Sequence, residues 1–245
     1  MRLSCFRQTQ RPLEASAAVN AATPGPVDLV IIKFPGNAGR AELSPIHPAN
    51  VWPKKHIVVW SINPPGYGES HGRASLDHVP AVARAVCKEV ERQYPSTPIL
   101  IYGNSIGALT AMRSVALTQQ RQRPPRVGLL LRNPPDLRPL ILDHRRQWFH
   151  GPVPKWLTRG LDPLLDSVAL AAACQCPFLL VQAERDRMVP PSNQDRIFHA
   201  YPGPKAKFVV PLADHHHAPN PVDQEEYERY TFAIEQSFLQ LWEPM

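Results

Sequence analysis

The residues best suited to chemistry in this chain are one serine, a few carboxylates and a run of histidines. Ser105 lies at the centre of Gly103-Asn104-Ser105-Ile106-Gly107, a G-x-S-x-G pattern. A serine hydroxyl is a weak nucleophile until a base takes its proton, and that base needs a carboxylate to fix its tautomer. If Ser105 is a nucleophile, a histidine and an acid must therefore come from elsewhere in the sequence.

The residues around Ser105 predict a strand, a very tight turn and a helix. Pro98 to Tyr102 is an apolar run of strand length, and Leu109, Met112 and Ala116 recur at helical spacing. On such a turn the serine is strained and its hydroxyl rises above the sheet edge, so side chains two positions before and after it would collide with neighbouring backbone. The two glycines therefore fit a nucleophile elbow, and we expect the helix to begin at the serine and aim its N–H groups at an oxyanion.

The order of the other candidates suits that turn, in which an acid and then a histidine follow the serine along the chain. Asp186 comes just after the predicted strand 177–182, where a side chain can reach over the sheet edge, and Glu184 is the alternative acid. The histidines His215 to His217 follow the predicted last strand 206–210, and each is a candidate base. Adjacent histidines in one loop rarely converge on one metal ion, so we expect no metal and no cofactor.

The elements that must position these side chains alternate between buried strands and helices. Strands that are apolar on both faces and alternate with helices indicate a mostly parallel, twisted sheet flanked by helices, an α/β fold. The candidates would then meet at one edge of this sheet. The predicted strands are 27–34, 56–62, 98–102, 126–132, 177–182 and 206–210, and the predicted helices are 76–94, 192–201 and 222–242.

The length of 245 residues, with 43% hydrophobic and 20% charged residues, indicates a single globular domain over residues 1–245. Residues 137–173 break the alternation with aromatic and leucine side chains among prolines, and we predict a small helical cap over Ser105. The alternative is a set of excursion helices without a role in recognition. Residues 1–26 are polar and alanine-rich and predict an edge hairpin or an ordered extension.

Composition argues against several other classes of function. The net charge is +6, but the basic clusters at 121–126 and 145–146 lack interleaved aromatic residues, so we expect no nucleic-acid partner. Cys174 and Cys176 belong to no disulfide or zinc pattern and are predicted to be buried thiols. No apolar stretch is long enough to span a bilayer, and the N-terminus lacks the apolar core of a signal peptide, so we expect a cytoplasmic protein.

Several short motifs, in the right order along the chain, resemble those of the α/β-hydrolase superfamily. The segment Asp186 to Pro190 (D-x-x-V-P) is similar to its acid loop, and Ala213 to His215 (A-D-H) is similar to its histidine loop. Residues 63–70 (N-P-P-G-Y-G-E-S) resemble its R-G-Y-G-x-S turn. Residues 35–39 (P-G-N-A-G) resemble the H-G-N-A oxyanion loop of the branch that includes acyl-protein thioesterases.

The resemblance covers nearly the whole chain and implies a role for each member of a catalytic triad. Ser105 is implied to be the nucleophile, and Asp186 the residue that orients the imidazole. The A-D-H motif selects His215 as the general base and then acid, with His216 and His217 as the alternatives if the motif is misaligned.

The resemblance also implies an oxyanion hole made of two backbone N–H groups. One belongs to Ile106, and the other to Asn37, with Ala38 as the alternative. Two positions depart from the family pattern: Pro35 stands where a histidine is usual, and Pro65 stands where an arginine is usual.

These expectations indicate a serine hydrolase that cleaves carboxylesters or thioesters through an acyl-enzyme. The apolar residues of the predicted cap suit a small-molecule or acyl substrate with an apolar portion. The alternatives are a serine peptidase of the same fold and a binding or scaffold protein that has lost turnover, which the substituted oxyanion loop favours.

Overall fold

The computed structural model describes residues 2–10, 26–37, 39–122, 124–140, 166–219 and 222–242. Within them one sheet has the strand order β1-β3-β2-β4-β5-β6-β7. Strand β1 runs antiparallel to β3 and all other neighbours are parallel, which confirms the mostly parallel α/β sheet. The strands are β1 (Ser4–Gln10), β2 (Leu29–Phe34), β3 (Ile57–Asn63), β4 (Ile99–Asn104), β5 (Val127–Arg132), β6 (Phe178–Ala183) and β7 (Lys205–Val210).

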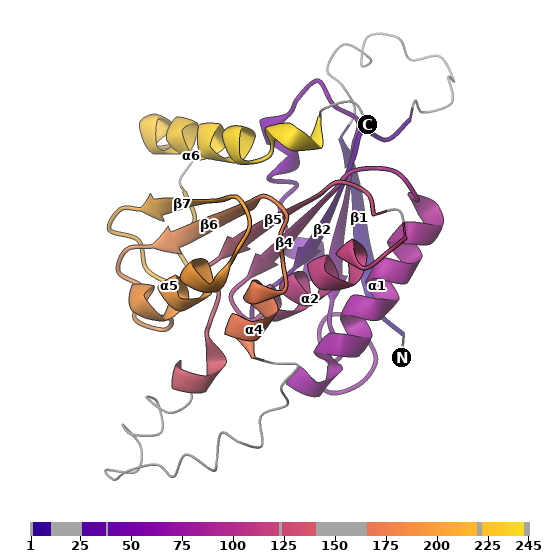
Figure 1. The fold of residues 1–245 in the computed structure, drawn as a ribbon, viewed down its shortest axis with the longest axis horizontal. Helices are drawn as coiled ribbons and strands as arrows, with labels where there is room; N and C mark the ends of the chain where they lie inside the picture. Colours follow the sequence, from indigo (N-terminus) through magenta and orange to yellow (C-terminus); the bar gives the residue numbers. More distant parts are fainter. Residues whose placement is uncertain are drawn as a thin grey trace.

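Helices cover both faces of the sheet (Figure 1). One face packs against α1 (Val79–Gln93), α2 (Gly107–Gln119), α4 (Ser167–Ala172) and α5 (Pro191–Ala200). The other face packs against α6 (Gln224–Ser237) and against the segment with the short turns η2 (Ala41–Leu43) and η3 (Ala49–Val51). Two further turns are η4 (Leu76–His78), before α1, and η7 (Leu239–Leu241), after α6.

Side-chain alternation along the strands produces two hydrophobic cores, one on each face. In β2, Val30 and Ile32 pack on the side of α1 and α2, while Leu29 and Ile31 pack on the side of α6. Every residue of β2 is buried, Lys33 included. Full burial of one such aliphatic side chain contributes roughly 1.5–3 kcal/mol, which is why these runs of the sequence adopt strand positions between two layers.

The parallel strands bring the candidate residues to one edge of the sheet. Strand β4 ends at Asn104, immediately before Ser105. Strand β6 ends three residues before Asp186, and β7 ends in the segment that leads to His215. Because carboxyl ends of parallel strands share an edge, loops from distant parts of the sequence meet there.

Three parts of the chain differ from the sequence-based expectations. Helix α2 begins at Gly107 and not at Ser105, because the φ angle of Ser105 is +50° and a right-handed helix requires a negative φ. The predicted helix 222–242 ends at Ser237 and continues as the turn η7. Residues 4–10 form a single edge strand, while residues 11–25, where the predicted hairpin falls, lie outside the described residues.

Most of the predicted cap, residues 141–165, also lies outside the described residues. The part that follows is α4, whose Leu170 and Ala171 are buried in the core shared with α2 and α5. Cys174 and Cys176 are buried and unpaired, as predicted, and burial raises the pKa of both thiols. None of the helices in the described ranges is long and apolar enough to cross a membrane.

Candidate active site

Ser105 occupies a strained turn between β4 and α2. Its φ angle of +50° lies in the left-handed region, and its backbone N–H donates to the carbonyl oxygen of Arg132 at 2.8 Å. The flanking glycines allow this turn. A Cβ on Gly103 would lie 2.7 Å from Cα of Ala108, and a Cβ on Gly107 would lie 2.3 Å from the carbonyl oxygen of Phe34. Strand, turn and helix can therefore approach one another this closely only without these two side chains.

A chain of two hydrogen bonds joins the serine, one histidine and one aspartate. Ser105 Oγ lies 2.9 Å from His215 Nε2, and His215 Nδ1 lies 2.7 Å from Asp186 Oδ2. Both His215 and Asp186 are buried, at 8% and 3% exposure. The structure thus brings together the three residues that the sequence singled out for this chemistry, and among the three histidines it places His215 against Ser105.

The surroundings of Asp186 fix the orientation of its carboxylate. Oδ1 accepts hydrogen bonds from the backbone N–H groups of Met188 and Val189 at 2.9 and 2.8 Å. Oδ2 accepts from Gln194 Nε2 at 3.2 Å in addition to His215. The alternative acid, Glu184, is engaged elsewhere, because its carboxylate accepts the backbone N–H of Leu212 at 2.7 Å.

Hydrogen bonds with the side chains of Asp214 and Arg132 hold the loop that carries His215. Asp214 Oδ1 accepts the backbone N–H groups of His216 and His217 at 2.9 and 3.1 Å, and these bonds lower the pKa of the Asp214 carboxyl. Arg132 Nη2 donates to the carbonyl oxygens of the same two histidines at 2.9 and 3.0 Å. His216 and His217 therefore contribute backbone atoms to the shape of this loop.

Asn133 ties the histidine loop to the sheet, a role that the sequence analysis missed. Its Nδ2 donates to the carbonyl oxygen of His215 at 3.0 Å, and its Oδ1 accepts the N–H of Ala183 at 2.9 Å. Asn133 is 1% exposed and has a φ angle of +47°. Asparagine tolerates this conformation better than most residues. An asparagine directly after a predicted strand was therefore the signal in the sequence that could have indicated this turn.

The loop after β2 passes beside the serine. A Cβ placed on Gly36 would lie 3.3 Å from Cβ of Ser105. The next residue, Asn37, accepts a hydrogen bond at its Oδ1 from the hydroxyl of Tyr67 at 2.7 Å, so the predicted turn at 63–70 contacts this loop. The N–H groups at the start of α2, just after Ser105, have no acceptor within the helix. The oxyanion hole of Ile106 and Asn37 remains a prediction, and Ala38 lies outside the described residues.

Two cavities flank the loop at residues 34–37. The first has a volume of 390 Å³, is lined mostly by apolar side chains of the α1 side, and includes Ile106 and Asn37. The second has a volume of 580 Å³, lies on the α6 side, and includes Gly36 and Asn104. Each cavity thus borders a direct neighbour of Ser105. Among the described residues, no group of three or more His, Cys, Asp or Glu is arranged to hold a metal ion.

No protein-family model matches the sequence, and no curated protein matches it. Solved structures do resemble the chain. The structure of Est1E from Butyrivibrio proteoclasticus with ferulic acid bound is 16% identical, with a TM-score of 0.67 and coverage of 98% of this chain and 96% of that chain. A putative hydrolase from Agrobacterium vitis S4 is 17% identical, with a TM-score of 0.64 and coverage of 96% and 93%.

XC6422 from Xanthomonas campestris, described as an α/β serine hydrolase without a lid, is 18% identical. Its TM-score is 0.56, and the match covers 98% of this chain and 90% of that chain. At these identities the likeness concerns the fold, and it agrees with the strand order and with the turn at Ser105. The chain has the α/β-hydrolase fold.

Proposed function

We propose that the protein is a serine hydrolase that cleaves carboxylesters or thioesters through an acyl-enzyme. The observation that carries this proposal is the hydrogen-bonded chain from Ser105 Oγ through the His215 imidazole to the Asp186 carboxylate. A base within hydrogen-bond distance of a nucleophile, and oriented by a buried acid, is the arrangement that makes a serine reactive.

In the proposed reaction, Ser105 Oγ attacks the carbonyl carbon of the ester while His215 Nε2 takes the hydroxyl proton. The oxyanion of the tetrahedral intermediate accepts hydrogen bonds from the N–H groups of Ile106 and Asn37. His215 then gives the proton to the leaving alcohol or thiol. A water molecule, activated by the same imidazole, attacks the acyl-enzyme, which releases the acid and restores Ser105.

Two features of the site support a role in ester cleavage for these residues over a purely structural role. The strained φ angle of Ser105 is the kind of local cost that persists where a side chain must be presented to a ligand. The apolar cavity of 390 Å³ beside Ile106 offers room for a small acyl or alcohol group.

Labelling with a fluorophosphonate probe tests the proposal, together with hydrolysis of p-nitrophenyl acetate. We expect covalent labelling and turnover in the wild type, and neither in the Ser105→Ala variant. Ser192 is exposed and forms no part of the site, so Ser192→Ala is the matched control and should be labelled like the wild type. A folded wild-type protein that is not labelled and hydrolyses no ester would favour the non-catalytic binding role.

A further inference from the structure

Lys33 is a buried cation in a row of apolar side chains. It follows Leu29 and Ile31 on the face of the sheet that packs against α6, and it is 5% exposed. Its Nζ donates to the carbonyl oxygens of Pro45 and His47 at 2.6 and 2.8 Å and lies 5.4 Å from the centroid of the Tyr102 ring. These contacts hold the ammonium group in place but supply no negative charge.

A second cation on the same face also lacks a carboxylate partner. Arg132 donates Nη2 only to backbone carbonyls, and its Nε is buried without a hydrogen-bond partner. Among the described residues, neither Lys33 nor Arg132 forms an ion pair. A buried cation without a counter-ion is costly, so the buried Lys33, with the half-buried Arg132 lining the same cavity, favours the binding of an anion.

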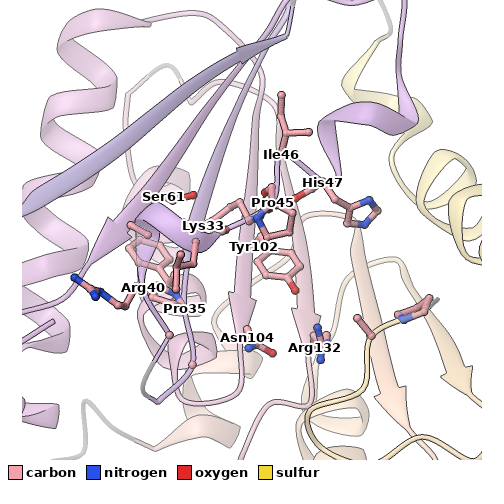
Figure 2. Close-up of a pocket in the computed structure, with 18 of the residues that line it drawn as sticks. Lys33, Pro35, Arg40, Pro45, Ile46, His47, Ser61, Tyr102, Asn104 and Arg132 are labelled. Carbon is pink, nitrogen blue, oxygen red and sulfur yellow. Dashed lines mark hydrogen bonds between the residues drawn. The ribbon is translucent and has the colours of Figure 1, made fainter. Parts of the chain in front are cut away.

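Both cations line the 580 Å³ cavity, as Figure 2 shows, with Lys33 above the Tyr102 ring and Arg132 at the end of its strand. Arg40 contributes a third positive charge, and among the described lining residues there is no aspartate or glutamate. Arg40 Nε lies 3.8 Å from Glu42 Oε2 in a weak, exposed ion pair, and Glu42 is not among the lining residues. Ser61, which is 1% exposed, also lines the cavity, and its hydroxyl has no hydrogen-bond partner.

The pKa values of Lys33 and His47 are both lowered mainly by burial, and at His47 the nearby positive charges add to this effect. Burial lowers the pKa of the Lys33 ammonium to about 7. Burial also lowers the pKa of His47 to about 4, and the charges of Lys33 and Arg132 act in the same direction. A bound anion would oppose these effects, because it favours the charged form of each base.

The cavity borders immediate neighbours of Ser105, although Ser105 itself is not among its lining residues. Gly36 and Asn104 line it, and the backbone of Gly36 lies against Ser105, since a Cβ on that glycine would come within 3.3 Å of the serine Cβ. An ester whose carbonyl is at Ser105 can therefore extend a substituent toward Lys33. The apolar cavity on the other side of the loop is left for the rest of the molecule.

We propose that the cavity lined by Lys33, Arg40 and Arg132 binds an anionic group, a carboxylate or a phosphate, of the ester that is cleaved at Ser105. This assignment rests on the proposed function, and it names the substrate class as negatively charged esters. Ser61 and Lys33 supply hydrogen-bond donors, and the arginines supply further positive charge.

Binding to the inactive Ser105→Ala protein tests the anion site without requiring catalysis. Hexanoate and hexyl phosphate are titrated separately, with hexanol as the neutral ligand of similar length. We expect at least one anion to bind about tenfold or more tightly than hexanol, since charged hydrogen bonds contribute roughly 1.5–3 kcal/mol. The anion that binds more tightly identifies the preferred group as a carboxylate or a phosphate. Equal affinity for hexanol and both anions would overturn the proposal.

Substitutions of residues that line the cavity test whether the anion binds there. In the Ser105→Ala background, Lys33→Met should weaken anion binding by about tenfold or more, and Arg40→Glu should weaken it by a smaller factor. Lys205 is the matched control, because its Nζ also donates to backbone carbonyls, those of Phe198 and Tyr201, at a distance from the cavity. Lys205→Met should keep the anion affinity. If Lys33→Met fails to fold, Arg40→Glu decides, and unchanged affinity in the folded variants contradicts the proposal.

The active protein tests the substrate class. The mono-p-nitrophenyl ester of adipic acid carries a free carboxylate, and its methyl-capped counterpart is neutral. We expect kcat/KM to be about tenfold or more higher for the charged ester, and we expect Lys33→Met to remove this preference. Preference for the neutral ester would overturn the substrate assignment. If neither ester is hydrolysed, the proposed function fails, while the binding experiment still decides whether the cavity is an anion site.

Discussion

At the scale of single residues, the candidate site depends on which atom of Asp186 faces the imidazole. Oδ1 accepts hydrogen bonds from the N–H groups of Met188 and Val189, so Oδ2 is the atom that accepts the hydrogen bond from His215 Nδ1–H. This arrangement leaves Nε2 of His215 without a proton and able to accept the one from Ser105.

The Asp186→Asn variant tests this dependence. The amide oxygen would keep the two N–H bonds of the loop, so the amide NH₂ would face His215 and place the imidazole proton on Nε2. We expect kcat for p-nitrophenyl acetate to fall by about 10⁴-fold with little change in KM, as the wrong tautomer does in other triads. Glu184→Gln is the control and should retain turnover, because the Glu184 carboxylate accepts the backbone N–H of Leu212 and takes no part in the hydrogen-bonded chain from Ser105 to Asp186. Turnover close to the wild type in Asp186→Asn would refute the role of Asp186.

Single residues also differ in whether the sequence alone can identify them. Ser105, Asp186 and the histidines 215–217 stand out in the sequence because each follows a predicted strand and is of a reactive type, and the resemblance of A-D-H to a histidine loop singled out His215. Lys33 does not stand out, because in the sequence it is one charge near the end of an apolar run, V-D-L-V-I-I-K-F. Its partners come from residues 45, 47 and 102, and only the folded chain brings them to it.

At the scale of elements, the loop that carries His215 is held by the residues that follow β5. The side chain of Asn133 bridges Ala183, at the end of β6, and His215. The position of His215, the proposed base, is therefore set by a strand end that contributes no side chain to the proposed triad.

A pair of asparagine variants separates positioning from stability. Asn193 is a matched control, because it is also buried and its side chain bonds both the N–H and the carbonyl of Asp136. Loss of either bridge leaves buried backbone groups unpaired, at a cost of about 1–3 kcal/mol each. We expect both variants to lower the free energy of unfolding, measured with urea, Asn133→Ala somewhat more because alanine tolerates a φ of +47° less well than asparagine, but only Asn133→Ala to lower kcat by about tenfold or more. Equal kcat in the two variants would contradict the positioning role.

The packing of α2 against the loop after β2 leads to a prediction about stability. A methyl group on Gly107 would meet the carbonyl oxygens of Phe34 and Pro35 at 2.3 and 2.5 Å, and neither backbone atom can move without shifting the sheet. A methyl group on Gly36 meets atoms no closer than 3.1 Å. We expect Gly107→Ala to lower the free energy of unfolding by about 3 kcal/mol or more, and Gly36→Ala to cost much less. Thermal denaturation of both variants checks this, and an unchanged Tm for Gly107→Ala would contradict it.

The same turn explains one error of the sequence analysis. Helical spacing after Ser105 predicted correctly that a helix follows, but the pattern does not mark the residue at which helical backbone angles begin. The close approach of β2 and β4 to α2 forces Ser105 into the left-handed region, so the helix begins at Gly107. The strands were easier to predict, because burial on both faces leaves a continuous apolar run in the sequence.

At the scale of the whole molecule, the sheet separates two different environments. In β2 the side chains on the face of α1 and α2, Val30, Ile32 and Phe34, are all apolar, while the face of α6 carries the ammonium group of Lys33 after Leu29 and Ile31. Both cavities border the loop at Phe34 and Pro35, so under the proposal one substrate meets an apolar cavity on one side of this loop and a cationic cavity on the other.

The cost of the buried Lys33 should appear in the stability of the whole protein as a function of pH. Its pKa is lowered from 10.5 to about 7 in the folded protein, so between these values the unfolded chain binds more protons than the folded one. The free energy of unfolding must therefore rise as the pH increases from about 7 towards 10, and this gain is lost again as the pH falls back to about 7. His47, whose pKa is about 4 in the folded protein, does not titrate there in this window.

Comparison with Lys33→Met isolates this contribution from those of all other groups. We expect the difference in the free energy of unfolding, wild type minus variant, to increase with pH by up to about 1.4 kcal/mol per pH unit between pH 7 and 9. Urea denaturation at several pH values measures it. A saturating anion should flatten this slope, because a bound negative charge keeps Lys33 protonated in the folded state. A difference that is independent of pH without any anion would show that Lys33 keeps an ordinary pKa, and the electrostatic reason for an anion in the α6-side cavity would then be lost.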